Sequence, residues 1–575
     1  MKEGKLNFLI GGPAGAGIEK SGKTLTTSLV RAGYYVYANV EHMSQIRGGN
    51  NYLRLRVDTQ PHEAHIEELD LIIALDKETI EEHIDSVSEG GAIVFDNETV
   101  KLPEDFDSKG VKMIDVPLKS LAIEKVRTPI MANVIALGLV CGLIEFDVEI
   151  LKDILAKIFS KKGDEVIGLN RDAAQIGFEL ASEHKDEVMV KMPTLEDQEK
   201  RMFIMGNDAF CVGAVKAGVK FVGEYPMTPS SSVLHFMARW SEKYGIVVKH
   251  TEDEIAACNS IIGAGFAGVR ALTGTSGGGF ALMTEAIGLA AMNEVPIVIC
   301  NVMRPGPATG LPTRTEAGDL RQVIHAGQGD PVKIVLLPGT MQECFDDGFD
   351  SFNLAEKYQL PVIVTFDKAM GESFYTAAPF DDSGCEVSRG SLLTQDELSK
   401  MEDYKRYLRT DNGISPRSIP GMKGGIHRAT SDEHDEYGDI TEDSKNRELM
   451  MEKRLNKVEA AREECPKPVV IGDEGADITF VTWGSGVGAS MDAIKELAKS
   501  GKSANILQIR TAWPFHTKEI KEELGKIKRP ILVDSNYTAQ MGGLITEHTG
   551  IIIEEKILRY DGRPLTGKYI TDRIK

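Results

Sequence analysis

Charged side chains in the middle third of the chain follow predicted strands. Arg304 and Arg314 lie in a proline- and glycine-rich loop after the apolar run 295–302. An arginine held in a rigid loop suits bidentate binding of a carboxylate or a phosphate. Glu254 opens a predicted helix of small residues, where it either complements the helix dipole or serves as a buried catalytic carboxylate. Because ligands bind at the carboxyl ends of parallel strands, these loops together favour a ligand site.

Two more loops of the same region carry groups that bind ligands. Tyr225, Pro226 and Thr228 belong to a loop with two prolines that comes directly after a predicted strand. Its hydroxyls and the amides of the next helix offer anion ligands, although the same residues also make a well-capped helix. Ser276 and Gly277 follow another predicted strand and form a second plausible ligand loop.

A glycine-rich turn near the N-terminus has two interpretations. Residues 17–24 fit the phosphate-loop pattern G-x4-G-K-[ST], which would place Lys23 on a terminal phosphate and Thr24 on magnesium. However, the first predicted strand ends before Gly12, so Lys23 would lie inside the following helix rather than in the turn. We therefore expect Gly12, Gly15 and Gly17 to form either a purely structural turn or one that brings a helix N-terminus to a phosphate-bearing ligand.

The order of predicted elements indicates an α/β protein with parallel or mixed sheets. Strands alternate with helices in three parts of the chain, which predicts three α/β units. One stretch is rich in charge, glycine and proline and shows no strand pattern, so it is either a linker or a functional cover. We predict α/β units at 1–190, 191–380 and 466–575, with the irregular segment at 381–465.

The composition excludes several classes of function. The 575 residues include 66 Lys and Arg against 87 Asp and Glu, which gives a formal net charge of −21. An acidic chain is a poor binder of nucleic acid or of an anionic membrane. The longest apolar run, 134–144, is too short to span a bilayer, and no signal peptide is visible. We expect a cytoplasmic protein that binds neither nucleic acid nor a membrane.

The cysteines are scattered and form no metal-binding pattern. There are seven, and no two are spaced as CxxC, so this chain holds no four-cysteine iron–sulfur cluster by a usual local spacing. We expect reduced and mostly buried thiols. The acidic run 432–436 is a candidate metal site, but a solvated structural loop is the better interpretation. No metal site is predicted in the chain itself.

Taken together, these motifs resemble the alpha subunit of the 2-oxoacid:ferredoxin oxidoreductases, in the form with the gamma domain fused to its N-terminus. The resemblance covers essentially the whole chain. Its most specific marks are the runs YPMTPSS at 225–231, EDEIAA at 252–257 and GLPTRTE at 310–316, with GISPR at 413–417 and DEHDEYG at 432–438. Met227 and Gly278 depart from the family's usual residues, isoleucine and proline, and leave the assignment standing.

This resemblance implies an architecture and a reaction. The three units would be the gamma domain, a thiamine-diphosphate pyrimidine-binding domain and a transketolase C-terminal-like domain. The family decarboxylates a 2-oxoacid on thiamine diphosphate, transfers electrons to ferredoxin and releases an acyl-CoA, so CoA is a co-substrate. Within the family, the sequence resembles the members usually labelled 2-oxoglutarate:ferredoxin oxidoreductase.

The resemblance also implies partners. The chain lacks the GDG tripeptide that typically holds the diphosphate and Mg²⁺, as well as cluster cysteines. A beta subunit would supply the diphosphate and Mg²⁺ site and the [4Fe-4S] cluster. Ferredoxin would accept the electrons, and a small ferredoxin-like delta subunit is a further possible member of the complex. The subunit is then expected to be inactive alone.

Individual residues take roles by the same resemblance. Glu254 would hydrogen-bond the aminopyrimidine nitrogen and favour its imino tautomer. Thr228 and Arg304 would orient the substrate, and Arg314 would bind a distal carboxylate or a CoA phosphate. The remaining expected cofactor contacts are Tyr225, Pro226, Ser276 and Gly277 for thiamine diphosphate, and Gly12, Gly15 and Gly17 for CoA.

Two other functions remain open from sequence alone. One is a nucleotide-dependent enzyme that uses the loop at 17–24. The other is a scaffold subunit with no catalytic role.

Overall fold

The computed structural model describes residues 2–43, 49–184, 187–195 and 200–574. By its contacts the chain divides into two compact units. The first contains residues 1–204 together with 373–379, and the second contains 205–372 and 380–575. The short segment 373–379 therefore belongs to the N-terminal unit, although the sequence prediction placed it in the second α/β unit.

The N-terminal unit is built on an eight-stranded mixed sheet with the order β7-β6-β5-β2-β4-β3-β16-β9. β4 runs antiparallel to both of its neighbours, β2 and β3. For β3 and β4 the reason is local: only nine residues separate the two strands, whereas a parallel pair needs a crossover connection of about a dozen residues or more. In sheet order the strands are β7 (Lys112–Asp115), β6 (Val87–Phe95), β5 (Leu69–Ala74), β2 (Leu6–Gly12), β4 (Asn51–Asp58), β3 (Tyr35–Glu41), β16 (Phe374–Ala377) and β9 (Met202–Met205).

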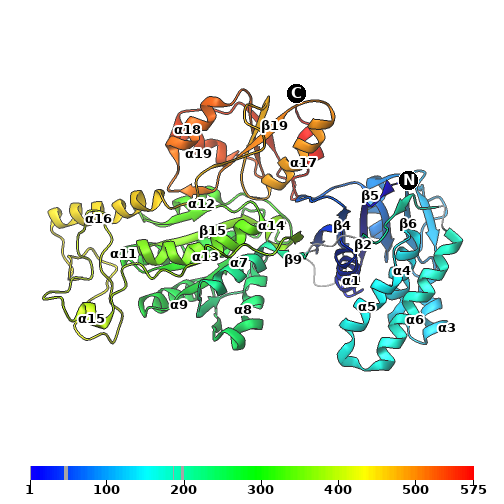
Figure 1. The fold of residues 1–575 in the computed structure, drawn as a ribbon, viewed down its shortest axis with the longest axis horizontal. Coiled ribbons are helices and arrows are strands. Elements are labelled where there is room, and N and C mark those ends of the chain that lie inside the picture. The colour runs from blue at the N-terminus through cyan, green and yellow to red at the C-terminus, as the bar shows by residue number, and fades with distance from the viewer. Residues whose placement is uncertain (1, 44–48, 185–186, 196–199, 575) are drawn as a thin grey trace. The chain divides into compact units, whose positions relative to one another are not determined.

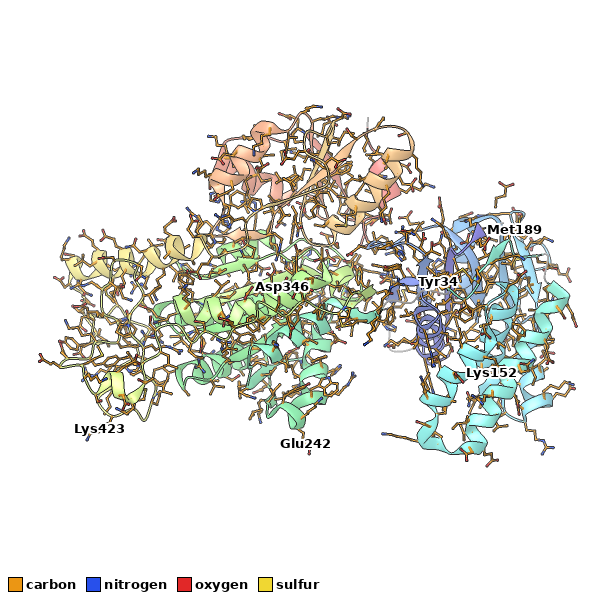
Figure 2. The ribbon with its side chains drawn as sticks, in the orientation of Figure 1. Tyr34, Lys152, Met189, Glu242, Asp346 and Lys423 are labelled. Carbon is orange, nitrogen blue, oxygen red and sulfur yellow. The ribbon has the colours of Figure 1, made fainter. Side chains whose placement is uncertain are left out.

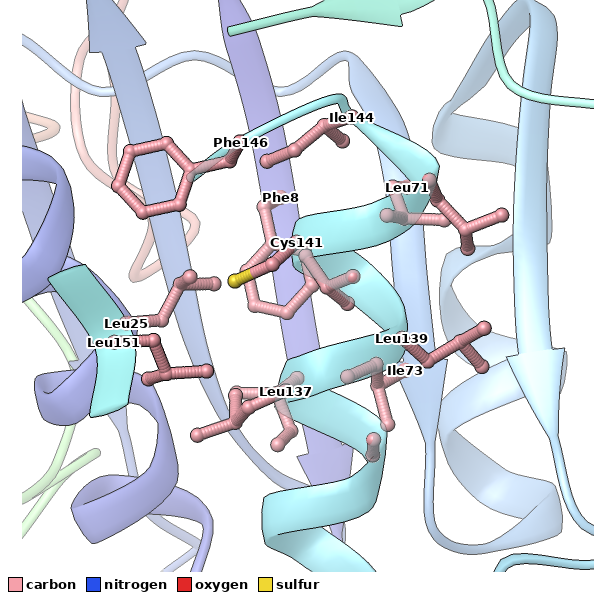
Figure 3. Packing of buried hydrophobic residues seen from close by; sticks show 14 of the residues in the cluster. Phe8, Leu25, Leu71, Ile73, Leu137, Leu139, Cys141, Ile144, Phe146 and Leu151 are labelled. Atoms are coloured by element: carbon pink, nitrogen blue, oxygen red, sulfur yellow. The ribbon is translucent and has the colours of Figure 1, made fainter. Parts of the chain in front are cut away.

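Helices pack on this sheet, and the side chains buried between the helices and the strands form the core of the unit. The apolar run at 134–144 forms most of α4, which is buried almost all round and packs tightly on α6. A Cβ on Gly138 would lie 3.0 Å from the Cα of Ala174, so only glycine allows this approach. Figure 3 shows Leu137, Leu139 and Cys141 among side chains of the sheet. The helices are α1 (Ile18–Arg31), α2 (Lys77–His83), α3 (Leu118–Val126), α4 (Ala132–Leu143), α5 (Val148–Ile158) and α6 (Asp164–Leu180), and a small pair, β1 (Lys2–Glu3) and β8 (Val190–Lys191), completes the unit.

The second unit contains a seven-stranded sheet, and the sequence predicted a parallel or mixed sheet here. Six strands are parallel, and β20, contributed from the C-terminal part of the chain, adds an antiparallel edge to β14. In sheet order the strands are β11 (Val247–His250), β10 (Phe221–Glu224), β12 (Ala271–Thr275), β13 (Ile297–Met303), β15 (Pro361–Asp367), β14 (Ile334–Leu336) and β20 (Thr511–Trp513). The helices are α7 (Gly206–Lys216), α8 (Ser231–Tyr244), α9 (Glu254–Phe266), α10 (Gly277–Leu282), α11 (Thr284–Met292), α12 (Leu320–His325), α13 (Met341–Tyr358) and α14 (Lys368–Glu372).

A third sheet of five strands forms the C-terminal domain of the same unit. Four strands are parallel and β17 is an antiparallel edge. The strands are β17 (Val469–Ile471), β19 (Ala504–Gln508), β18 (Ile478–Thr482), β21 (Pro530–Asp534) and β22 (Glu555–Leu558), with helices α17 (Gly486–Lys499), α18 (Thr517–Lys526), α19 (Gln540–Thr549) and α20 (Gly567–Thr571). The predicted α/β fold with parallel or mixed sheets is confirmed in all three sheets.

The irregular segment contains only α15 (Gln395–Leu398) and the long α16 (Ser444–Arg462) as regular elements in the part of the chain described. Buried ion clusters attach it to the second unit. Glu294, on the connection after α11, accepts hydrogen bonds from Lys453 at 2.6 Å and from Lys457, and all three side chains are buried. Glu356 of α13 likewise pairs with Arg417 at 3.3 Å. The segment is therefore a packed part of the fold rather than a free linker.

Side chains fill the space between these elements (Figure 2). Tyr34 is buried inside the N-terminal unit, while Glu242 and Lys423 lie at the edge of the second unit and are exposed. Among the described residues, no helix is both long and apolar enough to cross a membrane. Figure 1 labels the elements along the chain.

Candidate functional site

The parallel sheet of the second unit places the predicted site loops next to one another. β12 is hydrogen-bonded to β10 on one side and to β13 on the other, and all three run in the same direction. Their carboxyl ends therefore deliver the loops that begin at 225, 276 and 304 to one edge of the sheet. This is the edge at which open α/β sheets bind ligands.

Glu254 is buried at the start of α9, and one of its oxygens has no hydrogen-bond partner among the described residues. Asp253 caps the helix by accepting from the Ala256 amide at 2.7 Å, which leaves the Glu254 side chain free to turn inward. Glu254 is 3% exposed, and nothing in the described part of the chain hydrogen-bonds its Oε1. Burial raises the pKa of Glu254 above its usual range. An unpartnered buried carboxyl oxygen is costly and indicates a ligand that supplies the missing bond.

The backbone beside Glu254 is made of glycine. A Cβ on Gly279 would lie 2.8 Å from Cδ of Glu254 and 2.5 Å from Oγ1 of Thr275, and closer still to the Glu254 Oε1 atom. Gly279 is therefore needed if Glu254 is to keep its position. The neighbouring Gly278 faces open space, because a Cβ there would meet no atom within 4 Å.

Arg304 and Thr228 lie together, as the sequence predicted, but the contact involves the threonine backbone. Arg304 Nη1 donates to the Thr228 carbonyl at 2.7 Å. Burial lowers the pKa of Arg304, and the charges of Asp319 and Glu254 partly oppose this. The guanidinium therefore lies within electrostatic range of two carboxyl groups, and it is oriented by a neutral carbonyl.

Ser276 and Gly277 line the same place from β12 and α10. Ser276 is buried, and its Oγ has no hydrogen-bond partner in the described residues. A Cβ on Gly277 would lie 2.6 Å from Asp319 Oδ2, which is also buried and unpartnered there. Burial raises the pKa of Asp319 to about 6, against the lowering effect of Arg304. Three polar atoms without partners, on Glu254, Ser276 and Asp319, thus gather around glycine backbone.

The other predicted residues of this unit lie around these groups. Tyr225 is partly exposed, with its ring 6.1 Å from that of His250, and Pro226 is partly buried beside it. Arg314 is buried against Gly562 of the C-terminal domain, where a glycine Cβ would lie 3.2 Å from Arg314 Cβ.

The N-terminal turn separates into two parts. Gly15 and Gly17 have positive φ and line two cavities of about 590 and 610 Å³ on the N-terminal unit. Gly12 instead packs on Leu75, where a Cβ would lie 2.7 Å from the leucine Cβ. α1 begins at Ile18, so Lys23 lies inside the helix, paired with Glu19 at 2.5 Å. A phosphate loop would need that lysine at the turn, so this geometry does not favour the nucleotide interpretation.

Some polar groups of the site escaped the sequence prediction. Glu316 ends the recognised run 310–316 and Asp319 follows it, but neither acid was given a role at the site. Burial raises the pKa of Glu316 to about 7, with added repulsion from Asp319 and Asp561. Glu224 ends β10, and its complete burial beside Gly274 becomes visible only when the strands pair. No metal-binding cluster of acidic, histidine or cysteine side chains occurs in the residues that the structure describes.

Comparisons with protein families cover the chain in three parts. Residues 212–453 match the family described as "Pyruvate flavodoxin/ferredoxin oxidoreductase, thiamine diP-bdg". Residues 7–180 match "Pyruvate ferredoxin/flavodoxin oxidoreductase", and residues 468–568 match "Transketolase, C-terminal domain".

Individual relatives match over part or nearly all of the chain. The alpha subunit of 2-oxoacid:ferredoxin oxidoreductase 2 from Aeropyrum pernix is 32% identical, over 99% of this chain and 97% of the relative. The 2-oxoglutarate synthase subunit KorA of Methanothermobacter thermautotrophicus is 35% identical, over 58% of this chain and 87% of the relative. Among solved structures, 2-oxoglutarate:ferredoxin oxidoreductase from Magnetococcus marinus, with 2-oxoglutarate, coenzyme A and succinyl-CoA bound, is 31% identical with a TM-score of 0.92, covering 99% of this chain and 98% of that one.

Proposed function

This chain belongs to the 2-oxoacid:ferredoxin oxidoreductase alpha subunits, and on that premise we propose that it takes part in the oxidative decarboxylation of 2-oxoglutarate to succinyl-CoA. The observation that carries the proposal is the unpartnered Oε1 of Glu254, buried against Gly279 and within electrostatic range of Arg304. A carboxyl group of this kind suits the ring nitrogen of an aminopyrimidine.

The residues present fit thiamine diphosphate. When bound, this cofactor supplies the nucleophilic carbon and the electron sink that decarboxylation needs. Glu254 would hydrogen-bond the pyrimidine ring, and Gly277 and Gly279 leave room for a flat ring to approach. The unpartnered Ser276 hydroxyl, with Tyr225 and Pro226 at the rim, would complete the pocket.

Arg304 is the group that would bind the substrate carboxylate. Its Nη1 is oriented by the Thr228 carbonyl, and the remaining donors of the guanidinium suit a carboxylate fork. Arg314 would bind the second carboxylate of 2-oxoglutarate. The names of the relatives from Methanothermobacter and Magnetococcus support this choice of substrate.

The N-terminal turn would contribute to binding CoA. Lys20 and Lys23 line the cavity of about 590 Å³ beside Gly15 and Gly17, and they offer positive charge to phosphates. The adjoining cavity of about 610 Å³ is lined mainly by apolar side chains, among them Phe159, which suit an alkyl chain.

A partner would supply what the chain lacks. We assign the diphosphate and Mg²⁺ site and the [4Fe-4S] cluster to a beta subunit, because the seven cysteines here are free and none are spaced as CxxC. Ferredoxin would accept the electrons, with a small ferredoxin-like delta subunit as a further candidate member. Free thiols also suit the reducing cytoplasm, where we place the complex.

The substrate is tested with the native complex, purified with its partner subunits. We expect 2-oxoglutarate to give a higher kcat/KM for CoA-dependent viologen reduction than pyruvate or 2-oxoisovalerate. Arg304→Gln should lower kcat/KM for 2-oxoglutarate by about 10- to 100-fold, from the loss of a charge-assisted hydrogen bond. Equal activity with all three acids would contradict the proposed substrate.

A further inference from the structure

The loop that carries Asp319 is held by hydrogen bonds from the C-terminal domain. α12 follows this loop and packs beside α19 of that domain (Figure 1). The Ala317 amide donates to the Ser535 carbonyl at 2.8 Å. Asn536 is buried, and its Nδ2 donates to the Ala317 carbonyl at 3.0 Å.

A second amide side chain continues this contact. Gln540 Nε2 donates to the Gly318 carbonyl, and Gln540 Oε1 accepts from the Arg321 amide at 3.0 Å. Asn536 Oδ1 accepts from the Gln540 amide at 3.0 Å, which joins the two residues into one unit. We name Asn536 and Gln540 the amide clamp. Both of its side-chain amides donate to backbone carbonyls of the loop, so the clamp fixes the path of the loop itself.

The clamped backbone directs the Asp319 side chain toward the site around Glu254 and Gly277. Asp319 stands at the N-terminus of α12, but its side chain makes no capping hydrogen bond to that helix. Its Oδ2 lies against Gly277 instead, within electrostatic range of Arg304. An acidic residue that leaves its own helix uncapped and turns an oxygen with no partner among the described residues toward Gly277 needs a backbone that cannot relax.

We infer that Asn536 and Gln540 are positioning residues for the 2-oxoacid site, acting through Asp319, whose Oδ2 lies against Gly277. The C-terminal domain then shapes the substrate site in addition to completing the fold. This inference rests on the proposed function, because it takes this site as the one that binds the 2-oxoacid. Thr315 supports the same loop from another side, since its Oγ1 donates to Asp367 Oδ1 at 3.2 Å.

The experiment compares two substitutions of the same chemistry in the same domain. Asn536→Asp keeps the oxygen that accepts from Gln540 and removes the donor to Ala317. Asn505→Asp is the matched control: Asn505 Nδ2 donates to the Asp473 carbonyl at 2.9 Å, and its Oδ1 accepts from Thr479 at 2.6 Å, away from the loop. Both variants are made in the complete complex.

We expect Asn536→Asp to lower kcat/KM for 2-oxoglutarate at least about tenfold, mainly through KM, because small misplacements of a binding group are costly. Asn505→Asp should leave kcat/KM within about twofold of wild type, and thiamine diphosphate affinity should be equal in both variants. Gln540→Glu, which keeps the acceptor for Arg321 and removes the donor to Gly318, should repeat the KM effect, and it carries the test if Asn536→Asp does not fold.

Failure of this inference can be distinguished from failure of the proposed function. If Arg304→Gln raises KM but neither clamp variant does, the clamp is structural and the inference is wrong. If Arg304→Gln leaves the kinetics unchanged, the proposed function of the site fails first. A fall in thermal stability that is equal in Asn536→Asp and Asn505→Asp, with no difference in KM, also overturns the inference.

Discussion

Gly279→Ala is the sharpest perturbation that the site offers, because it adds one methyl group beside Glu254. The new Cβ would lie 2.8 Å from Glu254 Cδ and 2.5 Å from Thr275 Oγ1, separations that packed atoms do not reach. Thr275 and Glu254 are both buried, so the carboxyl group must turn away from its present direction. The expected result is loss of the bond between Glu254 and the cofactor.

The size of the effect follows from the type of bond. A hydrogen bond that involves an ionised group contributes about 1.5–3 kcal/mol, so thiamine diphosphate affinity should fall about 10- to 150-fold. Titration of the apo complex with thiamine diphosphate, followed by calorimetry, measures this directly. Gly278→Ala is the matched control on the same helix, since its Cβ meets no atom within 4 Å and alanine favours a helix over glycine by about 1 kcal/mol. Equal affinities in the two variants would refute the placement of the cofactor against Glu254.

Two further predictions concern stability. Glu294→Gln should lower the free energy of unfolding by about 3–5 kcal/mol in urea titration, because it leaves Lys453 and Lys457 buried without a counter-charge. The control Glu496→Gln removes one partner of an exposed ion pair and should cost less than about 1 kcal/mol. Equal losses in the two variants would contradict this prediction. Burial raises the pKa of Asp534 in the folded protein to about 6 from 3.8, so the folded state holds the proton more tightly than the unfolded state. The stability that this carboxyl group contributes is therefore greatest below about pH 4 and declines as the pH rises to about 6. Asp534→Asn should flatten that decline in thermal melts between pH 4 and 7, and an unchanged slope would show that Asp534 is not its source.

The α/β class could be predicted because it depends on local patterns. An apolar run, a glycine turn or a helix start is recognised from a few neighbouring residues. Such patterns predicted the strand at 6–10 and the helix that begins at Glu254. The structure also separates two neighbouring acids, since Glu254 is buried and Glu252 is exposed.

Long-range pairing could not be predicted in the same way. β16 lies within the stretch assigned to the second unit but pairs with β3, more than 300 residues earlier. Nothing in its four residues records that partner. Asp319 was missed for a related reason, because the loop that carries it is held by hydrogen bonds from the C-terminal domain. Side chains whose environment comes from distant segments carry no local signal.

We propose Glu254 as the carboxyl group on which the reaction depends. The most direct test is CoA- and 2-oxoglutarate-dependent viologen reduction by the complete complex carrying Glu254→Gln, with the exposed Glu252→Gln as control. We predict that Glu254→Gln lowers kcat at least about 100-fold, as the loss of a group needed for proton transfer does, while Glu252→Gln stays within about twofold of wild type. Wild-type turnover by Glu254→Gln would contradict it.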